Sequence, residues 1–261
     1  MTTTNSLLTR RVEQHVATLT LHHPPVNALT PALLDELDRT FESLRADATV
    51  KVIVFTGAGR VFIAGADIRM LAAISSSREG TDMALRGQAI FNKIEAFEKP
   101  VIAAINGVCL GGGLELAMCC PLRLAAEGSR LGQPEITLGI IPGFGGTQRL
   151  ARLIGRAKAT ELILTGDLLS AQEAKTLGLV SQVVPPEDLL RQAQGLAQKI
   201  ASKGQVAVRA ALQAIRQGAE LALPDGLALE ARLFGELCES DDKKEGMAAF
   251  LTKRQPRFKD R

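Results

Sequence analysis

The stretch Val101-Ile102-Ala103-Ala104-Ile105-Asn106-Gly107-Val108-Cys109-Leu110-Gly111-Gly112-Gly113-Leu114-Glu115 changes character twice along its length. Its first five residues form an apolar run that is typical of a buried strand, and Asn106-Gly107 is a turn signal that ends it. The three adjacent glycines lead directly into Leu114-Glu115-Leu116-Ala117-Met118, where we expect a short helix. This order of strand, glycine-rich turn and helix predicts a fold in which strands and helices alternate.

The same alternation is visible on both sides of this stretch. Residues 16–21 alternate like a half-buried strand, and residues 50–57 form a strand too apolar to face water on either side. Between them, Thr30 is a helix N-cap and Pro31 takes the first helical position. The apolar stripe of this helix consists of Leu33, Leu34, Leu37, Phe41 and Leu44. Residues 122–126 fit a further strand, so the sequence predicts an α/β fold with crossover units around a layered sheet.

The second half of the chain reads as helical. Ser170-Ala171-Gln172-Glu173 is a capping box ahead of a short helix that Gly178 closes. Further helical stretches are predicted at 187–202, 205–218 and 226–239, and residues 250–253 are expected to belong to a last helical stretch. Residues 70–95, by contrast, read as loop-prone. We therefore expect a sheet core followed by a helical tail.

Composition and charge exclude several classes of protein. The net charge of +3, from 31 basic and 28 acidic residues, provides no strong field for nucleic acid or a membrane surface. No apolar run approaches the ~20 residues that span a bilayer. Residues 1–8 lack the basic-then-apolar pattern of a signal peptide, so we expect a cytoplasmic protein.

The four cysteines show no Cys-x-x-Cys pair. In a chain of this length we interpret Cys109, Cys119, Cys120 and Cys238 as reduced, buried thiols, with no disulfide frame and no metal site.

The glycine run can direct free backbone N–H groups at a phosphate or at an oxyanion. The phosphate interpretation lacks support, because there is no Gly-x-x-x-x-Gly-Lys-Ser/Thr motif. After Gly57-Ala58-Gly59, Phe62 occupies the place of the third dinucleotide-binding glycine. The oxyanion interpretation requires a second donor. The segment 62–68 offers one, with Asp67 as N-cap of a helix that begins at Ile68; taken alone, this segment fits a simple strand-to-helix turn better.

Two glutamates lie in apolar, glycine-rich surroundings: Glu115 after the glycine run and Glu135 in Gly132-Gln133-Pro134-Glu135-Ile136. A buried carboxylate is costly unless it is paired or used. Either one alone fits a cap or a partner of an arginine, but two beside a proposed oxyanion hole favour acid–base chemistry.

Other catalytic chemistries lack their parts. All three histidines fall within the first 23 residues, and neither a Gly-x-Ser-x-Gly nor a His-Glu-x-x-His motif is present.

Six stretches together resemble the crotonase (enoyl-CoA hydratase/isomerase) family, and they occur in the family's order over nearly the whole chain. They are Pro25-Val26-Asn27-Ala28-Leu29, residues 62–68, residues 99–107, Gly111-Gly112-Gly113-Leu114-Glu115, Gly132 to Ile136 with Ile141-Pro142-Gly143-Phe144-Gly145-Gly146-Thr147-Gln148-Arg149, and residues 245–254.

The resemblance implies a spiral of ββα units over residues 1–200, with the CoA-thioester site, and a helical trimerisation region over residues 201–261. It implies an enoyl-CoA hydratase, a hydro-lyase of fatty acid β-oxidation that reversibly adds water to trans-2-enoyl-CoA. The implied partners are an acyl-CoA substrate and further copies of the chain in a homotrimer or hexamer. Nucleic acid and membranes are not expected as partners. No separate cofactor or metal is implied, because coenzyme A is part of the substrate.

The resemblance also assigns roles to particular residues. The N–H groups of Ala66 and Gly112 would form the oxyanion hole, Glu115 and Glu135 would be the catalytic acids, and the N–H of Gly143 would help to hold the catalytic water. Substrate contacts are implied for Ala64 (at the adenine of CoA), Gly65, Asp67, Ile68 and Arg69, and for Phe250 and Lys253 from a neighbouring subunit.

The chain departs from the family pattern at three places. Arg69 replaces a common Lys, and the segment Pro24-Pro25-Val26 lacks a Lys that some hydratases carry. Phe144 replaces a usual Ala, which would reshape the acyl pocket. Two alternatives remain open at this point: a Δ3–Δ2 enoyl-CoA isomerase, and an RNA-binding or scaffold protein that keeps the fold.

Overall fold

The structure is a computed structural model, and it describes residues 6–261. Most of the segment 1–8, in which we find no signal pattern, therefore lies outside the described residues.

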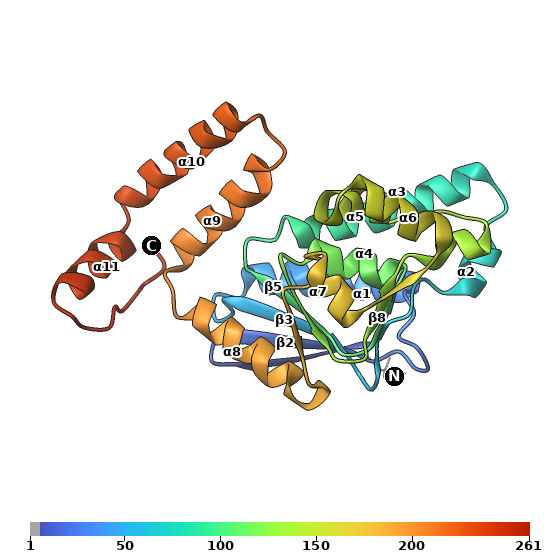
Figure 1. The fold of residues 1–261 in the computed structure, drawn as a ribbon. Helices are drawn as coiled ribbons and strands as arrows, with labels where there is room; N and C mark the ends of the chain where they lie inside the picture. The colour runs from blue at the N-terminus through green and yellow to red at the C-terminus, as the bar shows by residue number, and fades with distance from the viewer. Residues whose placement is uncertain (1–5) are drawn as a thin grey trace.

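Within residues 6–261, ten strands form two sheets (Figure 1). The six-stranded sheet has the order β1-β2-β3-β5-β7-β10, in which only the pair β1–β2 is antiparallel. Its strands are β1 (Leu8–Glu13), β2 (Val16–Leu21), β3 (Val52–Gly57), β5 (Val101–Ile105), β7 (Leu122–Ala126) and β10 (Gln182–Val184). The four-stranded sheet contains β4 (Val61–Ile63), β6 (Val108–Leu110), β8 (Arg130–Gly132) and β9 (Leu168–Ser170), in that order.

Helices follow the strands in a regular way. The α-helices are α1 (Pro31–Ala46), α2 (Ile68–Ala72), α3 (Ser77–Glu95), α4 (Gly112–Cys119), α5 (Gly146–Ile154), α6 (Arg156–Thr165), α7 (Ala171–Thr176), α8 (Leu189–Ala201), α9 (Gln205–Gly218), α10 (Leu223–Cys238) and α11 (Asp241–Leu251). Two 3₁₀ turns, η1 (Pro134–Leu138) and η2 (Pro186–Asp188), complete the list for the described part of the chain.

The chain winds as a spiral of ββα units. β3 and β4 are followed by α2 and α3, β5 and β6 by α4, and β7 and β8 by η1 and α5. Each turn adds one parallel strand to each sheet before its helix crosses over. The predicted spiral of ββα units with a helical C-terminal region is confirmed.

Strand β3 shows why so apolar a stretch suits this spiral. Val52 and Val54 face the outer side of the large sheet, which α8 covers, and Ile53 and Phe55 face the main core. All six residues of β3 are buried, as the sequence predicts. Burial on both faces is the usual environment of a parallel strand between helical layers.

Helix α1 begins as its sequence dictates. The Thr30 hydroxyl accepts a hydrogen bond from the N–H of Leu33, and Pro31 occupies the first turn. The five residues of the predicted apolar stripe are all buried. This helix is thereby fixed against the main core.

Some sequence-based expectations need correction. Residues 70–95 hold α2 and the long helix α3 rather than a loop, because Ser76 caps α3 through the N–H of Glu79 and four apolar or small residues pack inward.

The predicted helix 226–239 begins earlier, at Leu223, since Pro224 is tolerated in a first turn. The last helix, α11, contains Phe250 as expected but ends at Leu251, before Lys253. Cys238 is exposed, whereas Cys109, Cys119 and Cys120 are buried.

Helices α9, α10 and α11 extend away from the sheets as an arm at the C-terminal end of the chain (Figure 1). Apolar side chains stand exposed along it, among them Ile215, Leu223, Phe234, Phe250 and Leu251. None of the helices within residues 6–261 is both long and apolar enough to cross a membrane.

We expect Leu37→Ala to lower the free energy of unfolding by about 2–5 kcal/mol, because Leu37 is fully buried in α1 and its truncation leaves a cavity. Denaturant titration at fixed protein concentration measures the change. Leu85→Ala is the matched control, since the same truncation at a side chain that is 56% exposed on α3 removes little buried surface. Equal losses in the two variants would contradict the assignment of Leu37 to the core.

Candidate active site

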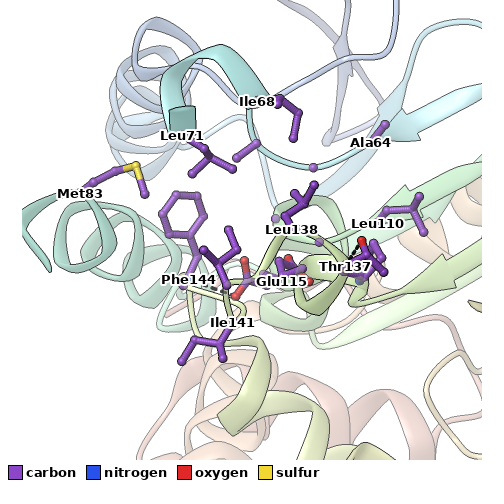
Figure 2. Close-up of a pocket in the computed structure, with 18 residues that line it drawn as sticks. Ala64, Ile68, Leu71, Met83, Leu110, Glu115, Thr137, Leu138, Ile141 and Phe144 are labelled. Carbon is purple, nitrogen blue, oxygen red and sulfur yellow. Dashed lines mark hydrogen bonds between the residues drawn. The ribbon is translucent and has the colours of Figure 1, made fainter. Parts of the chain in front are cut away.

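A cavity of about 280 Å³ opens where three parallel strands of the small sheet end (Figure 2). The segments that follow β4, β6 and β8 meet there, because the carboxyl ends of neighbouring parallel strands lie at one edge of a sheet. The cavity is lined by Ala64, Gly65, Ala66, Ile68, Leu71, Met83, Leu110, Gly111, Gly112, Glu115, Pro134, Glu135, Thr137, Leu138, Ile140, Ile141, Gly143 and Phe144. The spiral thus brings three segments that are far apart in sequence to one site.

The backbone N–H groups of Ala66 and Gly112 are among those at the cavity that have no acceptor within residues 6–261. The neighbours of Ala66 bond to Leu29, whose N–H donates to Gly65 and whose carbonyl accepts from Asp67. The N–H of Ala66 therefore points away from Leu29. A Cβ on Gly112 would lie 3.6 Å from the nitrogen of Ala66, so the two amides are close together.

Gly111 is required at the turn into α4. Its φ of +50° belongs to the left-handed region, and a Cβ there would come within 2.5 Å of Oε1 of Glu135. The absence of a side chain lets the Glu135 carboxyl approach the start of α4. The glycine run therefore serves both the amides and the carboxyl pair.

Glu115 is held by the backbone of a distant turn. It lies in the first turn of α4, 1% exposed, and its Oε1 accepts hydrogen bonds from the N–H groups of Phe144 at 2.8 Å and Gly146 at 2.7 Å (Figure 2). Burial raises the pKa of Glu115 to about 7; the two N–H donors act against that rise, and the nearby Glu135 adds to it.

Glu135 lies on η1 and faces the same cavity. Burial raises its pKa to about 7 as well. The side-chain amide of Gln133 lies against Glu135, 3.1 Å from both carboxyl oxygens. Gln133 is fully buried, so this contact orients the carboxyl.

Arg149 supports the turn that holds Glu115, a role that motif reasoning missed. Its guanidinium donates to the carbonyl of Phe144 at 2.9 Å and to the carboxylate of Glu95 at 2.7 and 3.0 Å. Arg216 of α9 donates at 2.9 Å to the carbonyl of the same Glu95. Arg149 ends a motif quoted above, but only the fold reveals what it contacts.

The structure brings together many of the predicted site residues and separates others. Ala64, Gly65, Ala66, Ile68, Gly112, Glu115, Glu135 and Gly143 all line the cavity. The carbonyl of Gly143 accepts from Gln88, and its N–H makes no hydrogen bond within residues 6–261.

Four predicted contacts do not line the cavity. Asp67 instead caps α2 through the N–H groups of Arg69 and Met70, and the side chain of Arg69 is exposed. Phe250 and Lys253 lie in and just after α11, on the arm, and Phe250 is 81% exposed (Figure 1).

The apolar end of the cavity is formed by residues that lie partly in the stretch we read as a loop. Leu71 and Met83 come from α2 and α3, and they lie beside Phe144 and Ile141 (Figure 2). The capping serine Ser76 and the apolar spacing of Gly87, Ile90, Phe91 and Ile94 are the signals that identify α3. The site is thus acidic at its centre and apolar on this side.

Comparisons with known proteins agree with this geometry. A sequence profile of the family described as enoyl-CoA hydratase/isomerase matches residues 11–261. A protein of Bacillus subtilis named probable enoyl-CoA hydratase is 47% identical over 95% of this chain and 96% of its own length. The crotonyl-CoA hydratase of Syntrophomonas wolfei is 45% identical over 94% and 95%, respectively.

Among solved structures, the enoyl-CoA hydratase from Bacillus anthracis superimposes with a TM-score of 0.94 at 41% identity, over 98% of this chain and 100% of that one. These matches extend over both the cavity and the C-terminal helices. The chain belongs to the enoyl-CoA hydratase/isomerase family.

Proposed function

We propose that this protein is an enoyl-CoA hydratase, a hydro-lyase that adds water across the double bond of a trans-2-enoyl-CoA. One observation carries the proposal: two carboxyl groups with raised pKa values and two backbone N–H groups without an acceptor in residues 6–261 line a single cavity. Hydration requires both kinds of group, since a proton must leave water, another must reach Cα, and charge develops on the thioester oxygen between these events.

The N–H groups of Ala66 and Gly112 are proposed as the oxyanion hole. Negative charge builds on the thioester oxygen as water attacks Cβ, and two fixed donors stabilise it without reorganising. Support comes from their closeness and from the lack of any protein acceptor for either amide within residues 6–261.

Glu115 is proposed as the base and Glu135 as the acid. Glu115 receives two backbone N–H bonds on one oxygen and sits in a helix first turn, and both features favour its anion. The carboxyl of Glu135 contacts the Gln133 amide at the longer distance of 3.1 Å, and the oxygen of that amide can accept a hydrogen bond from the protonated acid, so the proton of the pair is assigned to Glu135. Ionised Glu115 takes a proton from water, the oxygen bonds to Cβ, and protonated Glu135 gives its proton to Cα. The water would be held by the N–H of Gly143.

The rest of the substrate is proposed to lie along the segment after β4. The backbone at Ala64 would meet the adenine and Arg69 a phosphate of coenzyme A, which enters as part of the substrate, with no separate cofactor. Phe250 and Lys253 would reach this substrate from a neighbouring copy. The exposed apolar side chains on the arm support self-association through residues 201–261, as a trimer or as a hexamer. We further propose a cytoplasmic role in β-oxidation.

Isomerisation of a 3-enoyl-CoA is the alternative reaction for this family, and it needs only one proton-transferring acid. Two acids at one cavity favour hydration. Incubation with 3-hexenoyl-CoA and with trans-2-hexenoyl-CoA separates the two reactions. Formation of 3-hydroxyacyl-CoA from the 2-enoyl substrate supports hydration. Exclusive interconversion of the double-bond isomers refutes it.

We expect Glu115→Gln and Glu135→Gln each to lower kcat for crotonyl-CoA by about 10²-fold or more, because each amide keeps the shape but removes a proton carrier. The loss of absorbance of the conjugated thioester measures the rate. Glu127→Gln, at an exposed position outside the cavity, is the matched control and retains the wild-type rate. Near-normal turnover by either active-site variant would refute the assigned chemistry.

Ala66→Pro removes one proposed oxyanion donor while leaving both glutamates in place. We expect a loss in kcat of about 10²–10³-fold, the usual effect of deleting one such donor. A thermal unfolding curve and the affinity for coenzyme A report whether the variant is folded. A folded, CoA-binding variant with an unchanged kcat would exclude Ala66 from the hole.

Stability should depend on pH through the raised pKa of Glu135. Between pH 4.5 and about 7, the folded protein holds this proton more tightly than the unfolded chain does, so rising pH lowers the free energy of unfolding. We expect Glu135→Gln to be more stable than the wild type at pH 8 by about 1–3 kcal/mol, and nearly equal to it at pH 4. Denaturant titrations at both pH values test this expectation. An equal difference at the two pH values would show that Glu135 is not desolvated.

A further inference from the structure

The cavity has two distinct ends with the reacting groups between them. Ala64, Leu110 and Thr137 lie on one side of Glu115, and Leu71, Met83 and Phe144 lie on the other (Figure 2). If coenzyme A occupies the Ala64 side, as the proposed function has it, the acyl tail beyond the reacting carbons must enter the apolar side. The residues that bound the apolar side of the cavity therefore limit the length of the acyl tail.

The ring of Phe144 is a fixed wall of the apolar side. Phe144 is 3% exposed, and its ring meets that of Phe91 edge to face, with 5.5 Å between the ring centroids. Such pairs prefer this geometry, which holds the ring in one orientation. The ring is thus packed against α3, and moving it aside would break this contact.

Gly87 leaves the space on α3 against which this ring packs. A Cβ at position 87 would lie 2.3, 2.4 and 2.8 Å from three ring atoms of Phe144, so no larger residue fits while the ring stays in place. Gly87 lies in the interior of α3, where glycine is less favourable than alanine. The packing of the ring gives a physical reason for glycine at this position.

We propose that the ring of Phe144, packed against Gly87, ends the acyl pocket and restricts this enzyme to short enoyl chains such as crotonyl. The cavity of about 280 Å³ lies just below the range of roughly 300–1,000 Å³ that is typical of small-molecule sites. A longer tail would have to displace this packed ring or leave past Ile141, which is 65% exposed. The added methylenes would then stay in water and contribute little to binding.

The test compares the binding of butyryl-CoA and decanoyl-CoA, two saturated ligands that cannot be hydrated, by isothermal titration calorimetry. Each buried methylene adds about fourfold to affinity. We expect the wild type to bind decanoyl-CoA no tighter than butyryl-CoA. Phe144→Ala opens the space of the ring, so it should shift the affinity ratio toward decanoyl-CoA by at least tenfold. Leu85→Ala, the exposed truncation on α3, should leave the ratio unchanged.

A double-mutant comparison tests the packing of Phe144 against Gly87. Gly87→Ala alone pushes the ring into the cavity, so it should weaken the binding of butyryl-CoA and lower the Tm. In the Phe144→Ala background the same substitution meets no ring, so it should leave the Tm unchanged or raise it. If Gly87→Ala had equal effects in both backgrounds, the proposed packing of the Phe144 ring against Gly87 would be wrong.

The remaining outcomes separate this inference from the proposed function on which it rests. An identical ligand ratio in the wild type and Phe144→Ala, or a wild type that binds decanoyl-CoA tenfold tighter than butyryl-CoA, overturns the chain-length limit. A wild type that shows the expected binding ratios but hydrates no crotonyl-CoA supports the pocket wall and refutes the hydratase activity.

Discussion

The burial of the Glu115 carboxylate is the constraint on which the site depends. A carboxylate in an apolar interior is strongly disfavoured unless donors compensate it. Here the donors are two main-chain N–H groups, from Phe144 and Gly146, that only a substitution by proline removes. The turn that carries these N–H groups must keep its conformation, and the spiral of ββα units must place this turn next to the start of α4. Much of the architecture around the cavity serves this one requirement.

That requirement links the catalytic and the apolar parts of the cavity. Phe144 contributes its N–H to Glu115 and its ring to the wall beside Met83. One residue therefore connects the proposed base to the space proposed for the acyl tail. Packing of the ring on α3 also supports the backbone amide that Glu115 accepts from, so the shape of the apolar side and the position of this carboxylate are not independent.

Local signals predicted much of the fold. Thr30 and Pro31 specify the start of α1 by themselves, and the unbroken apolar run of β3 requires layers on both sides. The order of the family motifs indicated the spiral. The helix α3 was missed, because its capping serine lies in a run of serines and its interior contains glycines that read as loop. Exposure of Cys238 depends on the arm standing away from the sheets, which no local pattern encodes.

The site was predictable in its residue types but not in its contacts. Glu115 and Glu135 stand out as acids in apolar motifs, and the structure gives both the same cavity. The amides of Phe144 and Gly146 lie about thirty residues beyond Glu115, so their role follows from tertiary structure alone. Gln133 is similar: nothing in its neighbours in sequence distinguishes a buried amide that orients a carboxyl from a surface glutamine.

Glu95 accepts hydrogen bonds from two arginines, Arg149 and Arg216, and these bonds connect α9 to the turn that holds Glu115. Its carboxylate receives Arg149, which braces the carbonyl of Phe144, while its own carbonyl receives Arg216 from α9. The arm and the turn that holds Glu115 are thus bonded to a single residue at the end of α3. A rotation of α9 would move the residue that supports this turn, so the rigidity around Glu115 depends on a helix that does not line the cavity.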